Sequence, residues 1–587
     1  MSYSEKPTND KNQMKDFSQL KKNIKKDFSK LNTIKIAVLG DTATQFLTIA
    51  LRGLGFDYGY NFDIWEADYN QIERQVFDLN SDLHVFKPDF VIVFKSSHKL
   101  LGKYNKTNPE QYLSFGSNEL KALENIYTFL FEKLNTKVIF YNFNEIDDAV
   151  FGSFSNKIES SFLFQLRKLN YELMTISSKY QNLFLCDLSS IQNSVGKANV
   201  FQPSVYVNSD MVLSIDVLPK VATKTLDIIS AIYGKFRKCI ILDLDNTIWG
   251  GTIGDDGIEN IQIGNLGIGK AFTEFQYWIK KLINRGVIVA VCSKNTKSIA
   301  IEPFEKHPDM VLQLKDIAVF VANWENKVDN IKYIQSVLNI GFDTMVFLDD
   351  NPFERNMVRE MLPDICVPEL PDDPAEYLEF LYQSNLFETA SFSAVDLQRT
   401  ALYQVEAQRA TFQDCFTNED DFLKSLNMVS IVSSFNKFNV PRIAQLSQRS
   451  NQFNLRTVRY TETDILQLIS SKSHFTITFT LEDKFGDNGL VCVIILKKEN
   501  ADVLFIDTWL MSCRVLKRGM ENFVLNSIAQ IANENGFSTL KGQYLPTLKN
   551  EMVKDHYLHL GFRESNEFWN LNVKNYQNRL NYITYKQ

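Results

Sequence analysis

The chain has 587 residues, of which 44% are hydrophobic and 23% charged, and its formal net charge is −7. This length corresponds to two to four domains of ordinary size, and the composition is that of a globular protein rather than a disordered or collagen-like one. The acidic balance argues against a global basic field, so we expect no nucleic-acid partner. The seven cysteines contain no CxxC pair, which favours reduced thiols over a disulfide scaffold or a structural zinc site.

The N-terminus is rich in lysine and lacks the apolar segment of a signal peptide. No apolar run reaches the length of about 18 residues that a membrane span needs. We therefore expect a cytoplasmic protein that does not associate with membranes. Residues 1–32 are expected to form a flexible tail.

Apolar, β-rich runs alternate with helical stretches after this tail. The runs are residues 34–42, 90–94, 137–143 and 183–189. Strands that alternate with helices predict a parallel α/β domain, which we place at residues 33–233.

A second set of buried strands follows. These strands are expected at residues 238–247, 287–295, 317–322 and 344–352. An amphipathic helix separates the last two, and prolines in residues 367–374 end the unit. The pattern predicts a parallel α/β domain at 235–375, followed by a helical connector at 376–415.

The last part of the chain, residues 416–587, has a different pattern. Strands are expected at 475–483, 489–496 and 503–512, with a hairpin turn at 486–489, and an amphipathic helix follows from Met520. Antiparallel strands before a helix predict an α+β domain.

The central domain carries the sequence Asp-Leu-Asp-Asn-Thr at residues 243–247, where a buried strand ends. Ligands of parallel sheets bind at the carboxyl ends of strands. Asp243 is suited to attack phosphorus, and Asp245 to protonate the leaving group and then activate water. Thr247 is a candidate to bind the phosphate.

Three further strand or helix ends complete this pattern. Ser293 is a candidate hydrogen-bond donor to phosphoryl oxygen, and Lys327 a candidate to neutralise the phosphate. A phosphate dianion beside carboxylates needs a hard cation with oxygen ligands, which indicates Mg²⁺. The expected metal ligands are Asp243, Asp245, Asp349 and Asp350.

These motifs resemble those of the haloacid dehalogenase (HAD) superfamily and, more closely, its FkbH-like family. The resemblance rests on the motifs at 243–257, 292–295, 307–312, 323–327, 347–359, 450–460 and 487–493. It implies a capless, Mg²⁺-dependent HAD enzyme, since the 48 residues from Asp245 to Ser293 and the 22 from Lys327 to Asp349 leave no room for a large lid domain.

The resemblance also implies an activity and partners. FkbH-like proteins take the glyceryl group of 1,3-bisphosphoglycerate, remove its phosphates and deliver the acyl group to an acyl carrier protein in polyketide and related pathways. We therefore expect the chain to be a phosphatase and acyltransferase of secondary-metabolite or polysaccharide biosynthesis that acts on a small acyl phosphate. Cys292 is the candidate for the acyl thioester on the enzyme, and a buried structural cysteine is the alternative.

The C-terminal domain resembles a GNAT-type acyltransferase, in which a glycine-containing loop binds the pyrophosphate of coenzyme A. Arg514, Arg518 and Gly519 match this loop, whereas Lys517 stands where the middle glycine belongs. The resemblance implies binding of CoA or of a carrier-borne phosphopantetheine thioester, and a packing domain without a ligand is the alternative. A basic cluster comprising Arg442, Arg449 and residues 456–460 could dock an acidic carrier or form an ordinary solvated surface.

The N-terminal domain resembles a degenerate SGNH-type hydrolase. Gly40-Asp41-Thr42 occupies the place of a Gly-Asp-Ser nucleophile turn, and residues 200–230 contain no histidine to serve as the base. We expect a scaffold or recognition module. For the whole chain, two alternatives stay open: a plain HAD phosphatase acting on a small or protein-bound phosphate, and a non-enzymatic scaffold of a biosynthetic assembly.

Overall fold

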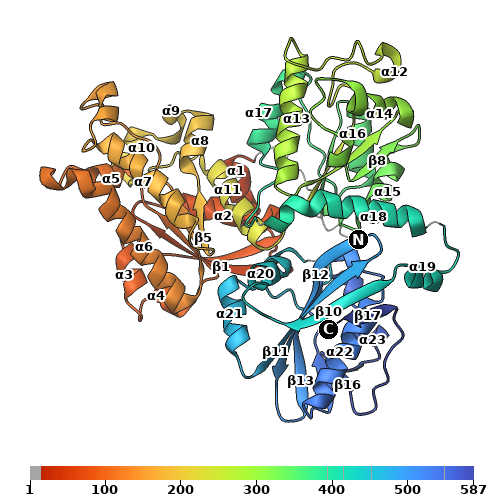
Figure 1. The fold of residues 1–587 in the computed structure, drawn as a ribbon. Coiled ribbons are helices and arrows are strands. Elements are labelled where there is room, and N and C mark those ends of the chain that lie inside the picture. Colours follow the sequence, from red (N-terminus) through yellow and green to blue (C-terminus); the bar gives the residue numbers. More distant parts are fainter. Residues whose placement is uncertain (1–14, 393, 414, 451, 548, 587) are drawn as a thin grey trace. The chain divides into compact units, whose positions relative to one another are not determined.

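The structure is a computed structural model that describes residues 15–392, 394–413, 415–450, 452–547 and 549–586. The chain divides into two compact units, residues 1–230 and residues 231–587 (Figure 1). The first unit contains one parallel sheet, and the second contains a parallel sheet and a larger mixed sheet. The fold is therefore mixed α/β.

The first unit is built on a five-stranded parallel sheet with the order β2-β1-β3-β4-β5. The strands are β1 (Asn32–Gly40), β2 (Tyr60–Glu66), β3 (Phe90–Phe94), β4 (Lys137–Tyr141) and β5 (Leu183–Cys186). The helices are α1 (Phe17–Asn23), α2 (Gln45–Asp57), α3 (Ile72–Phe77), α4 (Asp82–Phe86), α5 (Ser97–Tyr104), α6 (Phe115–Leu134), α7 (Phe162–Ser177), α8 (Leu188–Val195), α9 (Lys197–Val200), α10 (Pro203–Ser209) and α11 (Leu218–Ile232). This strand order is that of a doubly wound α/β fold, with its topological switch between β1 and β3.

Part of the predicted tail belongs to this first unit. Leu20 of α1 is fully buried, and the side-chain amide of Asn23 donates to the carbonyl oxygen of Gly53 in α2 at 3.0 Å. The prediction of a flexible tail is therefore wrong for α1, because its single apolar face packs on α2. The preceding residues of the predicted tail, 1–14, lie outside the described residues.

The first sheet of the second unit has four parallel strands in the order β8-β7-β6-β9. The strands are β6 (Cys239–Leu242), β7 (Ile288–Ser293), β8 (Val319–Ala322) and β9 (Met345–Leu348). The helices up to the connector are α12 (Ile253–Asp256), α13 (Gly269–Asn284), α14 (Lys297–Lys306), α15 (Lys327–Leu338), α16 (Pro352–Met361), α17 (Tyr377–Ser384) and α18 (Arg399–Gln413). Strands β6 to β9 lie where the buried apolar runs predict them.

The two faces of this sheet bury different side chains. Successive residues of a strand point to opposite faces, and here Ile240 and Val291 pack with α13, α14 and α17, whereas Ile241 and Cys292 pack with α15, α16 and α18. Both faces are covered, as expected for a parallel sheet.

The second sheet of this unit has eight strands in the order β15-β16-β14-β13-β12-β11-β10-β17. The strands are β10 (Met428–Ser434), β11 (His474–Asp483), β12 (Gly486–Lys498), β13 (Val503–Met511), β14 (Thr539–Gly542), β15 (Arg563–Ser565), β16 (Phe568–Asn572) and β17 (Ile583–Lys586). The remaining helices are α19 (Glu419–Ser425), α20 (Val440–Arg449), α21 (Glu462–Ser470), α22 (Met520–Glu534) and α23 (His556–His559). Most neighbours are antiparallel, and β13–β14 and β10–β17 are parallel.

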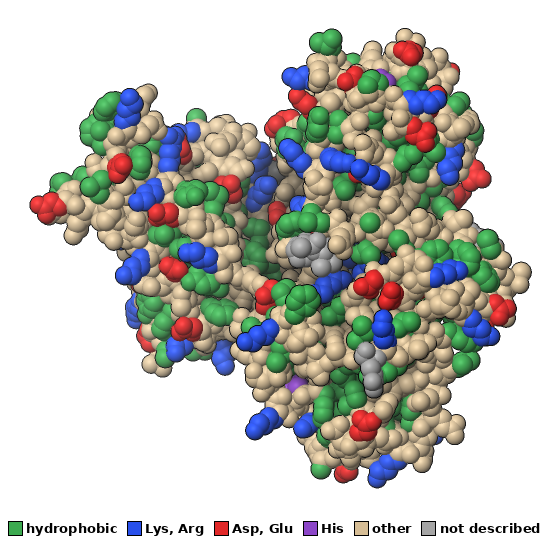
Figure 2. Space-filling view, viewed as in Figure 1, with side chains coloured by type: hydrophobic (Ala, Val, Ile, Leu, Met, Phe, Trp, Pro, Cys, Tyr) green, Lys and Arg blue, Asp and Glu red, His purple; other side chains and the backbone are tan. Residues whose placement is uncertain are grey.

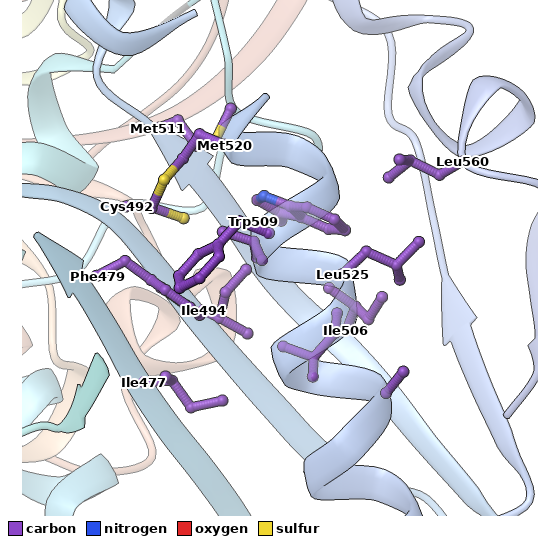
Figure 3. Close-up of a cluster of buried hydrophobic side chains, with 14 of the residues drawn as sticks. Ile477, Phe479, Cys492, Ile494, Ile506, Trp509, Met511, Met520, Leu525 and Leu560 are labelled. Atoms are coloured by element: carbon purple, nitrogen blue, oxygen red, sulfur yellow. The ribbon is translucent and has the colours of Figure 1, made fainter. Parts of the chain in front are cut away.

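Helix α22 packs its apolar face on this sheet. Figure 3 shows Met520 and Leu525 of the helix beside Phe479, Ile494 and Trp509 of the strands. The prediction of an α+β region with an amphipathic helix from Met520 is confirmed.

The hairpin between β11 and β12 turns earlier than predicted. Asp483 pairs with Gly486, so Lys484 and Phe485 form the turn and residues 486–489 belong to β12. The register shifts between Thr480 and Glu482, where the opposite strand has one extra residue. The Asp-Asn-Gly sequence therefore supplies a bulge, with Gly489 at a φ of 65°, rather than the turn.

No helix in the described ranges is long and apolar enough to cross a membrane. On the face shown in Figure 2, Lys and Arg side chains are interspersed with Asp and Glu side chains.

Candidate active site

The aspartate motif lies at the topological switch of the four-stranded sheet. Asp243 directly follows β6, and its backbone N–H donates to the carbonyl oxygen of Leu348 in β9 at 3.0 Å. Asp349 and Asp350 directly follow β9, which is the neighbour of β6. The connections leave β6 and β9 in opposite directions, which opens a crevice at the carboxyl ends of these strands.

Three carboxylates converge in this crevice. One oxygen atom from each of Asp243, Asp349 and Asp350 lies within 4.8 Å of the others. The Lys327 ammonium, at the first residue of α15, lies 2.9 Å from Asp243 Oδ2 and 2.6 Å from Asp349 Oδ2. Lys327 is only 3% exposed. Three carboxylates and one ammonium leave an excess of negative charge in a largely buried site.

Burial and mutual repulsion dominate the electrostatics. Burial, followed by the Asp243 carboxylate, raises the pKa of Asp349 to about 7 and also raises the pKa of Asp350. Burial alone would lower the pKa of Lys327, but the Asp243 and Asp349 carboxylates outweigh it and raise that pKa. The cluster is therefore poised to gain a cation.

The donor set fits a hard divalent cation. Asp243 Oδ1 is buried and accepts no hydrogen bond from the described residues, so one carboxylate oxygen is available in the crevice. Carboxylate oxygens are the ligands that Mg²⁺ prefers, usually one or two of them together with water. The structure thus brings together three of the four expected metal ligands.

Asp245 differs from the other three. Its Oδ1 accepts from Trp249 Nε1 at 2.9 Å and from the Ile253 N–H at 3.0 Å, and its Oδ2 accepts from Asn295 Nδ2 at 2.9 Å. These donors occupy the carboxylate, so its assignment as a side-chain metal ligand is not supported by the geometry. Burial raises its pKa, which suits a group that carries a proton to a leaving group.

The two hydroxyl side chains lie at the crevice with different surroundings. Thr247 is fully buried, and its Oγ1 accepts from the Asp350 N–H at 3.2 Å, so it helps to orient the third carboxylate. Ser293 ends β7 and is 2% exposed, and its carbonyl oxygen accepts from the Asn323 N–H at 3.2 Å. Both residues stay candidates for phosphate binding.

Two residues of the site were missed by the sequence reasoning. Asn295 holds Asp245, as described above, and the Arg355 guanidinium donates to the carbonyl oxygens of Asp349 and Asp350 at 2.9 and 2.6 Å. Arg355 is itself held by Glu369 at 3.1 Å. Both lie in motifs noted in the sequence, but nothing in the sequence alone indicated which residue each would contact.

Cys292 does not have the surroundings expected of a thioester-forming residue. It is fully buried, its side chain lies on the face covered by α15, and its Sγ donates to the carbonyl oxygen of Lys327 at 3.8 Å. Burial raises the pKa of its thiol, which disfavours the reactive thiolate. The geometry supports the alternative, a structural cysteine of the core.

The loop predicted to bind pantetheine is engaged within the protein. The Arg518 guanidinium contacts the carboxylate of Glu406 and lies 3.2 Å from that of Asp483. Gly519 precedes α22 with a φ of 73°, and Lys517 has a φ of 63°, a conformation that glycine adopts at lower cost. Arg518 is thus not available to bind a pyrophosphate without breaking these ion pairs.

The residues of the predicted basic cluster lie in two different surroundings. Arg456 lies 2.6 Å from the Asp507 carboxylate, and Arg459 donates to the carbonyl oxygen of Ser450 at 3.0 Å. Arg442 and Arg449 belong to α20 and line a cavity instead.

The expected nucleophile turn of the first unit lies at the carboxyl end of β1. The Thr42 side chain is fully buried, so its hydroxyl is not presented to solvent. His98 stacks on Phe201 with ring centroids 3.8 Å apart. The scaffold or recognition role of this unit stays a prediction, as does the SGNH likeness.

Comparisons with known proteins identify relatives of the chain, and the family model among them covers the first unit rather than the aspartate site. The family model described as "FkbH, N-terminal domain" matches residues 35–230. The solved N-terminal part of the protein BF1531 from Bacteroides fragilis, described as containing a phosphatase domain complexed with Mg, is 56% identical, with a TM-score of 0.62 over 64% of this chain and 100% of that chain. No curated protein matches the sequence.

Two acetyltransferases are also similar in structure. The ribosomal-protein-S18-alanine N-acetyltransferase from Escherichia coli is 14% identical, with a TM-score of 0.21 over 26% of this chain and 99% of that one. The spermidine N-acetyltransferase from Vibrio cholerae, solved with CoA and spermine, is 11% identical, with a TM-score of 0.21 over 25% of this chain and 96% of that one.

The parallel sheet, with its aspartates and lysine at the switch, defines a HAD-type protein. Within that class, the chain belongs to the FkbH-like family.

Proposed function

We propose that the second unit is an Mg²⁺-dependent phosphatase of the HAD type, with a small acyl phosphate as its substrate. The observation that carries this proposal is the cluster of Asp243, Asp349 and Asp350 around Lys327, with Asp243 Oδ1 free of hydrogen bonds from the described residues. The Mg²⁺ complex of the similar Bacteroides fragilis protein supports the choice of metal.

Each residue has a role that follows from its surroundings. Asp243 attacks phosphorus through a carboxylate oxygen and forms an aspartyl-phosphate. Asp245, whose pKa burial raises, gives its proton to the leaving oxygen and later takes a proton from the attacking water. Lys327 holds Asp243 and neutralises phosphoryl charge. A bound Mg²⁺ would be held by Asp243, Asp349 and Asp350, and it would neutralise charge on the phosphoryl oxygens.

The phosphatase half of the proposal is tested by phosphate release. The full chain is incubated with acetyl phosphate or p-nitrophenyl phosphate in Mg²⁺ or in EDTA. We expect release that requires Mg²⁺ and that Asp243→Asn abolishes, whereas Asp255→Asn, an exposed carboxylate of α12, behaves like the wild type. Equal rates for the wild type and Asp243→Asn would overturn the proposal, and the absence of release from both would favour the scaffold alternative.

We further propose that the acyl group is transferred to the phosphopantetheine thiol of an acyl carrier protein. This step requires a thiol that a substrate can reach, and Cys292 is fully buried. The burial of Cys292 favours the second candidate function, a plain HAD phosphatase, unless another cysteine accepts the acyl group.

The intact mass of the protein separates these two functions. After incubation with 1,3-bisphosphoglycerate and Mg²⁺, a mass increase of one glyceryl group supports transfer, and a carrier protein should then remove it. Phosphate release without any adduct would indicate the plain phosphatase.

A further inference from the structure

A second cluster of charged residues lies in the same unit, away from the aspartates. It surrounds a cavity of about 80 Å³, which we call the arginine pocket, lined by Lys238, Arg399, Arg442, Arg449, Arg514 and Cys513. Lys238 directly precedes β6, the arginines come from α18, α20 and the segment after β13, and Cys513 follows β13 by two residues.

The positive charge of the arginine pocket exceeds the negative charge beside it. The Asp396 carboxylate contacts both Arg399, at 2.7 Å, and Arg449. In the described part of the chain, neither Arg442 nor Arg514 forms an ion pair with a carboxylate. Among the described residues, Asp396 is therefore the carboxylate in ion-pair contact with the five cationic side chains of the pocket, and it contacts two of them.

Arg514 is a buried arginine whose hydrogen-bonding capacity is not fully used among the described residues. It is 8% exposed, and its Nη1 has no hydrogen-bond partner among the described residues. Its remaining hydrogen bonds are long, 3.4 Å to Ser512 Oγ and 3.3 Å to the Asn488 carbonyl oxygen. A buried guanidinium N–H without an acceptor is costly, so this group is suited to an anion in the pocket.

Burial and mutual repulsion also disfavour the charged forms of the neighbouring side chains Arg442 and Lys238. Burial, together with the positive charges of Arg514, Arg399 and Arg449, lowers the pKa of Arg442 to about 9. Burial likewise lowers the pKa of Lys238 to about 8. A bound anion would relieve this repulsion.

The thiol of Cys513 lies at the wall of the arginine pocket. Unlike Cys292, it is partly exposed, and its Sγ lies 3.7 Å from the Tyr403 hydroxyl. The backbone is held in place because Asn339 Nδ2 donates to the Cys513 carbonyl oxygen at 2.7 Å.

The arginine pocket is separate from the aspartate site. Lys238 precedes β6 and Asp243 follows it, so the two sites lie at opposite ends of the same strand. Five residues of extended chain span roughly 17 Å. One small phosphate cannot occupy both places, and the pocket is therefore an additional anion site.

We propose that the arginine pocket binds the phosphate of a small acyl phosphate and that Cys513 accepts its acyl group. This inference rests on the proposed transfer function and names the residues that perform its first step. Sγ attacks the acyl carbon, the S–C bond forms, and the C–O bond to phosphate breaks. The thiol proton passes to the leaving phosphate, so a thioester and hydrogen phosphate are the products. The guanidinium groups hold the phosphate as it leaves.

The first experiment measures protection of the thiol. The full chain is alkylated with iodoacetamide in EDTA, with and without inorganic phosphate, and each cysteine is quantified by peptide mass spectrometry. We expect phosphate to slow the alkylation of Cys513 and to leave that of the exposed Cys415 unchanged. Arg442→Gln should raise the phosphate concentration for half-protection about tenfold or more. Equal alkylation of Cys513 with and without phosphate would overturn the anion site.

Phosphopantetheine also carries a phosphate group, so it is tested in a separate arm of this experiment. Protection by acetyl phosphate or inorganic phosphate at concentrations where phosphopantetheine gives none supports the small acyl phosphate. Protection by phosphopantetheine alone would contradict the proposed ligand and assign the pocket to the carrier arm.

The second experiment looks for the adduct. Wild-type protein incubated with acetyl phosphate should gain one acetyl group on the peptide that contains Cys513. Cys513→Ser should lose the hydroxylamine-labile adduct, whereas Cys415→Ser should keep it. An adduct that persists in Cys513→Ser, or no adduct in the wild type, would refute the acyl-accepting role.

Failure of this inference is distinguishable from failure of the proposed phosphatase. Acyl adducts are measured in EDTA with acetyl phosphate, and Mg²⁺-dependent release of phosphate is measured with p-nitrophenyl phosphate, which has no acyl group. Mg²⁺-dependent release without an adduct overturns the inference alone. An adduct on Cys513 without such release overturns the phosphatase alone.

Discussion

Lys327 shows how much a single buried cation contributes to the site. It is 3% exposed and joins two carboxylates that would otherwise repel each other. Its position at the first residue of α15 is fixed by Asn326, whose side chain accepts from the Val328 N–H at the start of the helix. The helix start therefore places the ammonium between two strand ends.

We expect Lys327→Met to lower both activity and stability. Removing one partner of a buried ion pair leaves uncompensated charge and costs roughly 3–5 kcal/mol. Urea unfolding in EDTA should show this loss, and Mg²⁺ should restore part of it. Lys332→Met in the same helix, whose side chain is 51% exposed, should be nearly neutral. A wild-type free energy of unfolding for Lys327→Met would contradict the role described for this residue.

Binding of the metal should be visible in the stability of the protein. Three carboxylates lie within 4.8 Å of one another, and the single Lys327 ammonium leaves a net negative charge that a metal ion would neutralise. At 100 times its dissociation constant, a bound ion adds about 2.7 kcal/mol. We expect Mg²⁺ to raise the melting temperature of the wild type, and Asp349→Asn to lose this response. Asp255→Asn should keep it, and a response retained by Asp349→Asn would contradict the assigned ligand set.

At the scale of elements, α18 connects the two sheets of the second unit. Tyr403 packs in the core under the parallel sheet, whereas Glu406 and Arg409 form ion pairs with Arg518 and Asp483 of the mixed sheet's region. Figure 1 shows α18 between these two sheets. The ion pairs are buried, so the helix is held on both sides.

Asp483→Ala should destabilise the second unit strongly. Asp483 lies 2.8 Å from Arg409 and 3.2 Å from Arg518, and its removal leaves two buried guanidinium groups with fewer partners. We expect a loss of roughly 3–5 kcal/mol in urea unfolding. The neighbouring Glu482→Ala, an exposed residue of the same strand, is the matched control and should change little. Equal stability of the two variants would show that the network contributes nothing.

Helix α23 makes the stability depend on pH. Burial, and to a lesser extent His559, lowers the pKa of His556 to about 3, from the 6.5 that is usual for histidine. Between these two values the unfolded chain binds a proton that the folded chain does not. The free energy of unfolding therefore falls as the pH drops below 6.5, by about 1.4 kcal/mol per pH unit for this group.

The comparison of two histidine variants isolates this effect. His556→Gln should flatten the decrease of stability between pH 7 and pH 5, and His559→Gln, an exposed neighbour, should retain the wild-type slope. Trp509 is a suitable fluorescence probe, because its ring centroid lies 4.5 Å from that of His556. Parallel slopes for the wild type and His556→Gln would disprove the assignment.

The sequence predicts buried apolar strands better than largely exposed ones, whether they lie inside a sheet or at its edge. Strands β3, β6 and β7 are continuous apolar runs, because both faces of a parallel sheet are buried. Strands β15 and β17 were not predicted, since they are short, largely exposed and defined by pairing with a neighbour. The Asp-Asn-Gly sequence predicts a turn but forms a bulge, because local sequence does not determine the register of the opposite strand.

In the candidate site, too, some features could be predicted from the sequence and others depend on the tertiary fold. The residue types and strand ends of Asp243, Lys327 and Asp349 could be predicted, because parallel strands bring their carboxyl ends to one edge. The fully buried position of Cys292 could not, since it depends on which face of β7 the helix α15 covers. Likewise, Arg442 and Arg514 are 72 residues apart in sequence, and only the tertiary fold brings both to one cavity.

At the scale of the whole molecule, both proposed sites lie within residues 231–587, the second compact unit. We expect residues 235–587, expressed alone, to fold and to retain Mg²⁺-dependent phosphate release with p-nitrophenyl phosphate. Circular dichroism would establish that the fragment is folded, and the full chain serves as the reference. A folded fragment without release would show that residues before 235 contribute to the reaction.

The ion pairs of α18 also have a consequence for synthesis on the ribosome. The chain emerges from its N-terminus, and Glu406 precedes its partner Arg518 by 112 residues. The parallel sheet is thus complete in the nascent chain while Glu406 and Arg409 of α18 can pair only with each other and still lack Arg518 and Asp483. During that interval α18 can be held only by its contacts with the parallel-sheet region, such as the packing of Tyr403 and the Gln404 amide, which donates to the Ile317 carbonyl oxygen at 3.0 Å. Its docking should therefore be completed late, when the mixed sheet has been made.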